Sequence, residues 1–287
     1  KMRNLCLSQI VHFSLDVLDK SSRVLWVDSE RDRLYATYQD QIIVVQISAC
    51  RVLMSTFLPL SSELICALPI AELGSILIAG SGGSLITMNE SSGEWEEVGE
   101  IEGGLLATSL SPDGDLVVCV SSAGEIVILS TEWDVVSNSN KCSPVLKQVS
   151  LSWRADGQGF VISRHSADGK GRVSIHDRSG LRVGESDVLE GFCGCSCISP
   201  DGGIIACATR GKDPKVLLLE PNGLQHTSFP VPPSRAHLHP SALSWNSDGR
   251  LLTLELLDPA TGSATVQLFY RGNYHWYLKY ELHAGLS

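Results

Sequence analysis

Ser111-Pro112-Asp113-Gly114 is one copy of a short phrase that recurs along the chain at a nearly fixed interval. The other clear copies are Arg154-Ala155-Asp156-Gly157, Ser199-Pro200-Asp201-Gly202 and Asn246-Ser247-Asp248-Gly249. Their glycines are 43, 45 and 47 residues apart, and weaker copies centred on Asp32 and Gly74 precede them. Repeats of about 40–45 residues with a β-type composition are typical of propeller blades that have four strands each. The six repeats therefore predict an all-β propeller.

Each copy of the phrase lies between two runs of strand-forming residues. In the fourth repeat we expect strands over 148–153, 159–163, 172–177 and 181–188, with the phrase as the first turn. Asp-Gly suits that turn because it tolerates a positive φ between two β runs. The equivalent second and third strands of the other repeats are predicted at 33–38 and 42–47, 75–79 and 84–88, 115–120 and 125–130, 203–208 and 215–219, and 250–256 and 264–269.

Both ends of the chain are also strand-like. Met2–Phe13 precedes the first repeat and Tyr274–Leu282 follows the sixth. Pairing a first strand with a last one closes a ring and removes the exposed sheet edges. We therefore predict one domain over residues 1–287, a seven-bladed WD40-like β-propeller whose last blade is incomplete in this chain, as in a fragment of a longer protein. The polar stretch Asp134–Pro144 is expected to lack regular structure, either as a flexible loop or as a place where residues are absent from the sequence.

Composition limits the classes of partner. The net charge is −10, so the chain lacks the clustered basic residues that bind nucleic acid. No stretch approaches the roughly 18–20 apolar residues that cross a bilayer, and we expect no membrane association. Nine cysteines, an odd number scattered among strand-like segments, are typical of free thiols in a reducing compartment. These features predict a cytoplasmic protein that also has access to the nucleus.

Two clusters resemble metal sites. Cys193, Cys195 and Cys197 alternate along one strand, but zinc usually takes pairs spaced C-x₂₋₄-C with a second pair elsewhere. His237 and His239 alternate in a proline-bounded loop without an evident third ligand. Core packing and a surface loop are the favoured interpretations. Nucleophile-elbow, P-loop and dinucleotide-binding motifs do not occur in the sequence, so we predict no catalytic, cofactor-binding or metal-binding residues.

Partner contacts are expected in two places. The loops between second and third strands open on one face, and their basic residues can meet an acidic partner or an RNA backbone. An aromatic string after the sixth repeat can form a hot spot. The alternatives are a solvated loop face and packing within a blade. The candidate contact residues are His165, Lys170, Arg172, Arg210, Lys212, Lys215, Tyr274 and Trp276.

The turns resemble degenerate WD40 repeats, in which only His176-Asp177 matches the dipeptide that ends the third strand. Longer stretches are similar to the largest subunit of the Elongator complex (elongator complex protein 1). They are Met2–Leu5, Gly99–Gly104, Val149–Gln158, Glu220–Leu224, Leu243–Asn246 and Gly272–Lys279. The last of these is rich in rare residues. The resemblance covers the chain from its first residues to its last ten.

This resemblance implies the first of two N-terminal propellers of a non-catalytic scaffold subunit. The implied process is carboxymethyl-type modification, at C5, of the wobble uridine of tRNA. The implied partners are a second propeller subunit and a radical-type iron–sulfur acetyltransferase subunit, which carries the chemistry. Contact with tRNA would be indirect, through the complex, and homodimerisation would use regions absent from this chain.

Two other functions stay open on the sequence. One is a generic WD40 scaffold for protein–protein interaction in another complex. The other is a propeller-bearing hydrolase domain, which would need titratable residues to converge on the central channel. The inner strands carry mainly Ser, Cys and apolar residues, which favours a scaffold.

Overall fold

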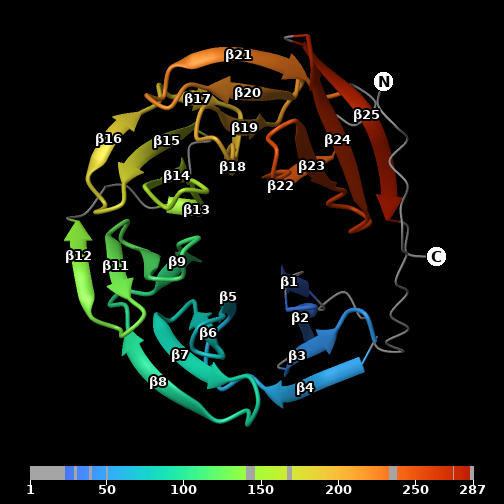
Figure 1. Ribbon diagram of the computed structural model, residues 1–287. Helices are drawn as coiled ribbons and strands as arrows, with labels where there is room; N and C mark the ends of the chain where they lie inside the picture. Colours follow the sequence, from blue (N-terminus) through green and yellow to red (C-terminus); the bar gives the residue numbers. More distant parts are fainter. Residues whose placement is uncertain are drawn as a thin grey trace.

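The computed structural model describes residues 23–28, 31–38, 41–49, 51–139, 146–166, 170–232, 238–273 and 275–284, and within them it contains strands and turns without a helix. These strands form six antiparallel sheets arranged around a ring (Figure 1). In each sheet the strands pair in chain order, with the first strand at the middle of the ring and the fourth at the rim. The prediction of an all-β propeller is confirmed.

The sheets are numbered here as blades 1 to 6. Blade 1 consists of β1 (Arg23–Asp28), β2 (Arg33–Tyr38), β3 (Gln41–Gln46) and β4 (Arg51–Phe57). Blade 2 consists of β5 (Leu64–Ile70), β6 (Ser75–Gly80), β7 (Ser84–Asn89) and β8 (Trp95–Glu100). Blade 3 consists of β9 (Leu105–Leu110), β10 (Leu116–Ser121), β11 (Ile126–Ser130) and β12 (Val135–Ser139). Blade 4 consists of β13 (Leu146–Trp153), β14 (Gly159–Ser166), β15 (Lys170–Asp177), β16 (Arg182–Glu185) and the short β17 (Leu189–Glu190). Blade 5 consists of β18 (Phe192–Ile198), β19 (Ile205–Thr209), β20 (Lys215–Leu219) and β21 (Gln225–Pro230). Blade 6 consists of β22 (His239–Trp245), β23 (Leu251–Leu257), β24 (Ala264–Gly272) and β25 (His275–Ala284).

The repeated phrase forms the turn between the first and second strands of every blade. Its last residue has a left-handed φ in all six copies: Asp32, Gly74, Gly114, Gly157, Gly202 and Gly249, with φ between 57° and 80°. In the third blade the Gly114 N–H donates to the Ser111 carbonyl over 2.9 Å, which closes the turn. The backbone conformation thus explains why the phrase ends in Gly, and in Asp at its weakest copy.

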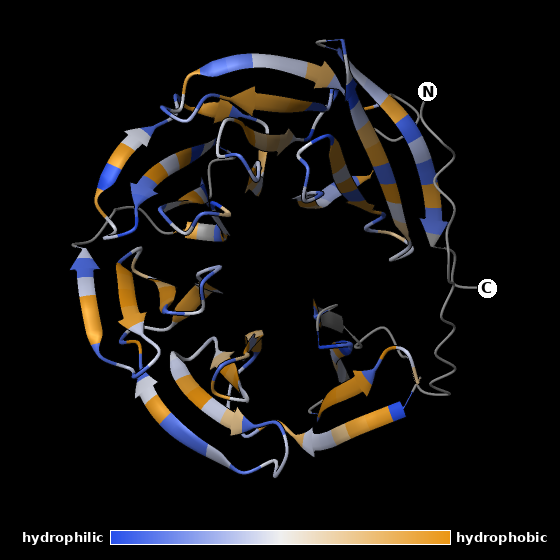
Figure 2. Ribbon diagram, viewed as in Figure 1, coloured by the Kyte–Doolittle hydropathy of each residue, from blue (hydrophilic) through white to orange (hydrophobic). Residues whose placement is uncertain are grey.

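The hydrophobic core lies between the blades. Five clusters of buried residues occupy the five seams between consecutive blades. At the seam between blades 2 and 3, for example, Leu77 and Leu85 pack with Val117 and Cys119. The second strands of blades 2 and 5, β6 and β19, are accordingly buried on both faces. Figure 2 shows apolar colour concentrated on the inner strands and polar colour on the loops and several rim strands. Each blade is therefore stabilised mainly by its neighbours.

Two sequence expectations need correction. The segment at 274–282 was expected in a seventh blade, but His275–Ala284 pairs with β24 and forms the fourth strand of blade 6. The stretch Asp134–Pro144 was expected to lack regular structure, yet Val135–Ser139 pairs with β11 as the rim strand of blade 3. In both cases the segment forms the fourth strand of a blade. Its sequence pattern does not show which strand it pairs with.

Six blades lie in the described residues, so a seventh blade stays a prediction. The expected strand Met2–Phe13 lies outside the described residues. The first strands of consecutive blades contact one another from β1 to β22, whereas the described residues show no comparable contact between β22 and β1 (Figure 1). None of the described residues forms a helix long and apolar enough to cross a membrane.

Candidate interaction surfaces

The two basic loops lie on the same side of blades 4 and 5. Leu189–Glu190 joins them, because Lys170 pairs with Glu190 in the sheet register and the Arg210 N–H donates to the adjacent Gly191 carbonyl over 2.7 Å. Lys170, Arg172, Arg210, Lys212 and Lys215 are all exposed. Acidic residues are interleaved with them, namely Glu185, Asp187, Glu190 and Asp213. The face is thus of mixed charge, and its contact with a partner stays a prediction.

His165 does not belong to this exposed face. The second strand of blade 4 extends to Ser166, so His165 lies within β14 and pairs with Gln148 and Gly171. Its side chain is buried. The expectation of a surface histidine was wrong because the sequence pattern ended the strand too early, at Ser163.

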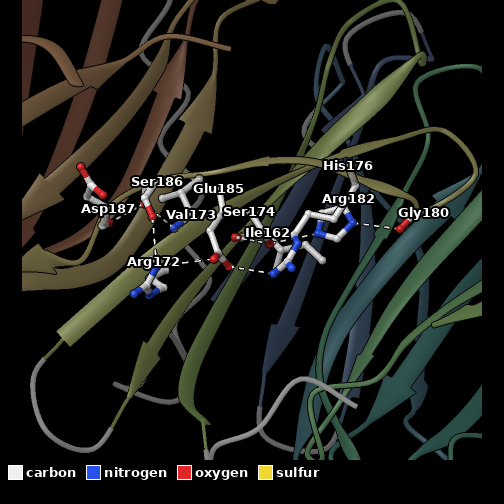
Figure 3. Close-up of polar contacts among 10 residues, drawn as sticks. All are labelled: Ile162, Arg172, Val173, Ser174, His176, Gly180, Arg182, Glu185, Ser186 and Asp187. Atoms are coloured by element: carbon white, nitrogen blue, oxygen red, sulfur yellow. Dashed lines mark hydrogen bonds and ion pairs between the residues drawn. The ribbon is translucent and has the colours of Figure 1, made fainter. Parts of the chain in front are cut away.

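Arg172 is held by the rim of its own blade. Its guanidinium lies 3.5 Å from the Glu185 carboxylate and donates to the Ser186 carbonyl over 3.4 Å. Arg182 approaches the other oxygen of Glu185 at 3.2 Å, so one carboxylate lies between two guanidinium groups (Figure 3). Because these groups are about a third to a half exposed, the contacts position Arg172 more than they stabilise the fold.

The remnant of the WD40 dipeptide has a structural role. The His176 ring is buried, stacks on Phe160 at 5.3 Å between ring centroids, and lies between the Gly180 carbonyl at 2.9 Å and the Ser174 hydroxyl at 3.0 Å (Figure 3). Burial lowers the pKa of His176, so the ring is neutral at pH 7 and Nδ1 donates to the carbonyl while Nε2 accepts from the hydroxyl. This buried histidine fastens the turn before β16.

Trp276 packs within the protein. It is half-buried, and its ring lies 5.4 Å from that of Phe229 and 5.5 Å from that of Trp245. The exposed aromatic residue of the string is Tyr277, which lies on the other face of β25. The structure therefore supports blade packing for Trp276, whereas Tyr274 lies outside the described residues.

The three alternating cysteines are buried in the seam between blades 5 and 6. The Cys193 thiol donates to the Ala208 carbonyl over 2.9 Å. Burial raises the pKa of Cys197 and of the nearby Cys207. Among the described residues, no group of three or more His, Cys, Asp or Glu side chains is arranged to hold a metal ion. His239 is exposed, and His237 lies outside the described residues.

Ion pairs close two of the seams on the face that carries the Asp-Gly turns. At the seam between blades 1 and 2, the Glu90 carboxylate accepts from Arg31 over 3.2 Å and from the Tyr35 hydroxyl over 3.0 Å, and also pairs with Arg33. At the seam between blades 3 and 4, Arg178 pairs with Asp113 at 2.7 Å. In both seams, the turn after the third strand of one blade reaches the first turn of the preceding blade.

The seam between blades 2 and 3 has a cleft at the corresponding place. The turn after the third strand of blade 3 here presents Trp133, which packs partly on the core of this seam. The cleft has a volume of about 650 Å³. It is lined by Leu73, Ser75, Thr87, Asn89, Glu94, Trp95, Glu96 and Trp133. Sequence reasoning overlooked these residues, although two tryptophans beside glutamates at rim turns were visible in it.

A family model described as ELP1 first N-terminal beta-propeller matches residues 2–141 and 140–286. The chain is 26% identical over 256 residues to Elongator complex protein 1 of Rattus norvegicus, and the match covers 72% of this chain and 19% of the relative. The chain is 29% identical over 236 residues to Elongator complex protein 1 of Arabidopsis thaliana, and the match covers 74% of this chain and 18% of the relative. The chain thus spans about a fifth of the length of these curated relatives.

Solved structures are similar in fold alone. The beta-propeller domain of Cps50 (Swd1) from Myceliophteria thermophila has a TM-score of 0.69 and 13% sequence identity, and the match covers 92% of this chain and 86% of that one. KlHsv2 with loop 6CD replaced by a Gly-Ser linker has a TM-score of 0.67 and 13% identity, over 91% of this chain and 85% of that one. At this identity the likeness supports the propeller and no particular function.

Proposed function

The chain belongs to the family of the first N-terminal β-propeller of Elongator complex protein 1, and we propose that it serves the Elongator complex as a non-catalytic scaffold module. The family match over nearly the whole chain is the observation that carries this proposal. Curated relatives named Elongator complex protein 1 support it. The mechanism is rigid presentation of loops and blade rims to neighbouring subunits.

The surroundings of the ring's centre support a scaffold over an enzyme. The first strands of blades 2, 3 and 5, which line the middle of the ring, have the sequences LICALPI, LLATSL and FCGCSCI. They carry small, apolar, hydroxyl and thiol side chains without a carboxylate or a histidine. Asp28 in β1 and His239 in β22 are single residues at strand ends, so no first strand carries the paired carboxylates or histidines of general acid–base catalysis. A hydrolase would need such groups to converge there.

The finer proposal concerns tRNA. In it, the complex modifies the wobble uridine at C5 with a carboxymethyl-type group, and this subunit organises a second propeller subunit and a radical-type iron–sulfur acetyltransferase. The chain meets tRNA only indirectly and works in the cytoplasm, with access to the nucleus. The net charge of −10 supports indirect contact, because a strongly acidic module repels a polyanion.

We also propose that a seventh blade completes the ring in the full-length protein. In β23 and β24, alternate residues such as Thr253, Val266, Leu268 and Tyr270 are only half-buried. The equivalent second and third strands of blade 2, β6 and β7, are buried on both faces. One more sheet would cover this face of blade 6. A version extended by about 50 residues, the period of one blade, should melt at a higher temperature than the 287-residue chain, and equal melting temperatures would contradict this.

The scaffold role is tested by purifying the tagged full-length protein from its own cells and identifying what accompanies it by mass spectrometry. Stoichiometric recovery of a second propeller protein and a radical-type iron–sulfur acetyltransferase is expected. In parallel, deletion of residues 1–287 should reduce C5-carboxymethyl-type uridines in total tRNA, measured by liquid chromatography and mass spectrometry. Recovery of a different assembly, with unchanged tRNA nucleosides, would overturn the proposal and leave a generic WD40 scaffold.

A further inference from the structure

Trp133 adopts a backbone conformation that its neighbours give to glycine. Its φ is 71°, and its N–H donates to the Ser130 carbonyl over 3.0 Å. Gly180 in blade 4 and Gly223 in blade 5 occupy the same position of the equivalent turn, with φ of 88° and 94° and the same hydrogen bond. A bulky residue is rare in this region. Blade 3 thus accepts backbone strain to place an indole where blades 4 and 5 place no side chain.

This indole is one wall of the cleft between blades 2 and 3, and Trp95 is another. Trp95 begins β8, and 55% of its side chain is exposed. Glu94 and Glu96, on either side of Trp95, also line the cleft. Lysine and arginine are absent from the lining. Two indoles beside two carboxylates form a suitable site for a cation, because the ring faces and the carboxylates both attract positive charge.

A buried hydroxyl at the cleft gives an independent observation. Ser75 lines the cleft and is 9% exposed. Within the described part of the chain, its Oγ has no hydrogen-bond partner. A buried polar group without a partner is unfavourable. A ligand that brings an N–H donor to this oxygen would satisfy it.

The charge of the surrounding blades points to the same chemistry. Between Arg51 and Lys141 the sequence holds thirteen Asp and Glu residues and no Lys, Arg or His. Blades 2 and 3 are formed by this segment. Three of its carboxylates, on Glu90, Asp113 and Asp115, pair with arginines of blades 1 and 4. Neither blade supplies a cation of its own to the seam that they share.

We propose that the cleft between blades 2 and 3 binds the cationic side chain of a lysine or arginine in a basic segment of another polypeptide. The side chain would enter between Trp95 and Trp133, with its N–H groups near Glu94, Glu96 and the Ser75 hydroxyl. The acidic surface of blades 2 and 3 attracts the flanking basic residues of that segment. Polyanions such as RNA are repelled from the same surface, which sets this site apart from the basic loops of blades 4 and 5.

The test measures binding of a probe peptide to the purified full-length protein by fluorescence anisotropy. The probe is a fluorescein-labelled, end-capped Gly–Ser peptide that carries three arginines, and its neutral match carries citrulline at the same positions. We expect saturable binding of the arginine peptide, weakening as salt rises from 50 to 500 mM, and at least about tenfold weaker binding of the citrulline peptide. This result does not depend on membership of any complex, so it can fail or succeed separately from the scaffold proposal.

Variants distinguish binding of the peptide at the cleft from attraction of the peptide by the acidic surface as a whole. Trp95→Ala, at an exposed position, should weaken binding about fivefold or more, and the Glu94→Gln, Glu96→Gln double variant should do the same. Trp133→Gly, which installs the residue of the neighbouring turns, should also lose affinity and serves as a second test of the aromatic walls. The matched control is Asp213→Asn with Glu220→Gln on blade 5, which removes the same charge far along the ring and should stay within twofold of wild type.

Two results would overturn the proposal. Equal loss of affinity in the cleft and control double variants, with Trp95→Ala unchanged, would show diffuse electrostatic attraction without a site. Equal binding of the arginine and citrulline peptides would show that the cleft does not recognise a cation.

Discussion

Removal of the Glu90 carboxylate should loosen blade 1 from the ring. Glu90 is 5% exposed and lies in the turn after the third strand of blade 2. It accepts two hydrogen bonds of 3.2 Å from the Arg31 guanidinium and one of 3.0 Å from the Tyr35 hydroxyl, and it pairs with Arg33. Every one of these partners belongs to blade 1. The carboxylate therefore links the two blades across their seam.

The cost of Glu90→Ala follows from the burial of the groups left behind. Removing one partner of a fully buried ion pair costs about 3–5 kcal/mol. The guanidinium groups of Arg31 and Arg33 are 27% and 28% exposed, so water compensates them in part. We expect a loss of about 2 kcal/mol in the free energy of unfolding, which corresponds to about 3–4 °C in melting temperature for a chain of 287 residues.

Two measurements check this expectation. Differential scanning calorimetry of the full chain gives the melting temperature, and hydrogen exchange followed by mass spectrometry locates the change. Exchange should rise in the peptides of blade 1 while those of blades 4 and 5 keep their protection. The matched control is Glu94→Ala, four residues along the same turn, whose carboxylate meets only the Ser92 hydroxyl at 3.4 Å among the bonds described. Equal melting shifts for the two variants would refute the reasoning.

Three further predictions concern packing, pH and thiol reactivity. Gly171→Ala should lower the melting temperature by several degrees, because a Cβ there would lie 2.1 Å from the buried Phe192 ring and overpacking costs about 1–3 kcal/mol. The control variant Gly99→Ala has open space around it and should melt like wild type. Burial lowers the pKa of His176 from its ordinary value of 6.5. The stability that the neutral ring contributes is therefore complete above pH 6.5 and declines as the pH falls below that value. The urea concentration at the midpoint of unfolding should fall between pH 7.5, 6.5 and 5.5, and the His176→Gln variant should lack this part of the decline. Burial also raises the pKa of Cys197, so Ellman's reagent should modify it only after unfolding, and labelling of the native protein at the rate of a free thiol would contradict its buried place.

The positions of the first turns could be read from the sequence because one backbone requirement recurs six times. A left-handed φ selects Gly, and more rarely Asp, at the end of each turn. This requirement is local, and the repeat interval extended it to the weakest copy, where Asp32 has a φ of 57°. The strands followed from the turns, since each blade repeats the same spacing.

The features that the sequence concealed depend on contacts between segments. Whether His275–Ala284 joins blade 6 or another sheet is decided by its pairing with β24, and its alternating pattern suits any rim position. The burial of His165 depends on how far β14 extends beside β13 and β15. Trp133 could not be singled out from the sequence, because its significance arises from the blade 2 side chains across the seam.

The distribution of charge explains why the seams differ. Blades 2 and 3 have no basic residue between Arg51 and Lys141, so a salt bridge within this pair of blades is impossible. Their outer seams are closed by arginines that the flanking blades supply, Arg31 and Arg33 on one side and Arg178 on the other. Among the described residues, no arginine reaches the seam that they share, which holds Trp133 and the cleft instead. A cation that neutralises this cleft therefore does not come from blades 2 and 3 themselves, so the surface of these two blades is where a basic partner gains most.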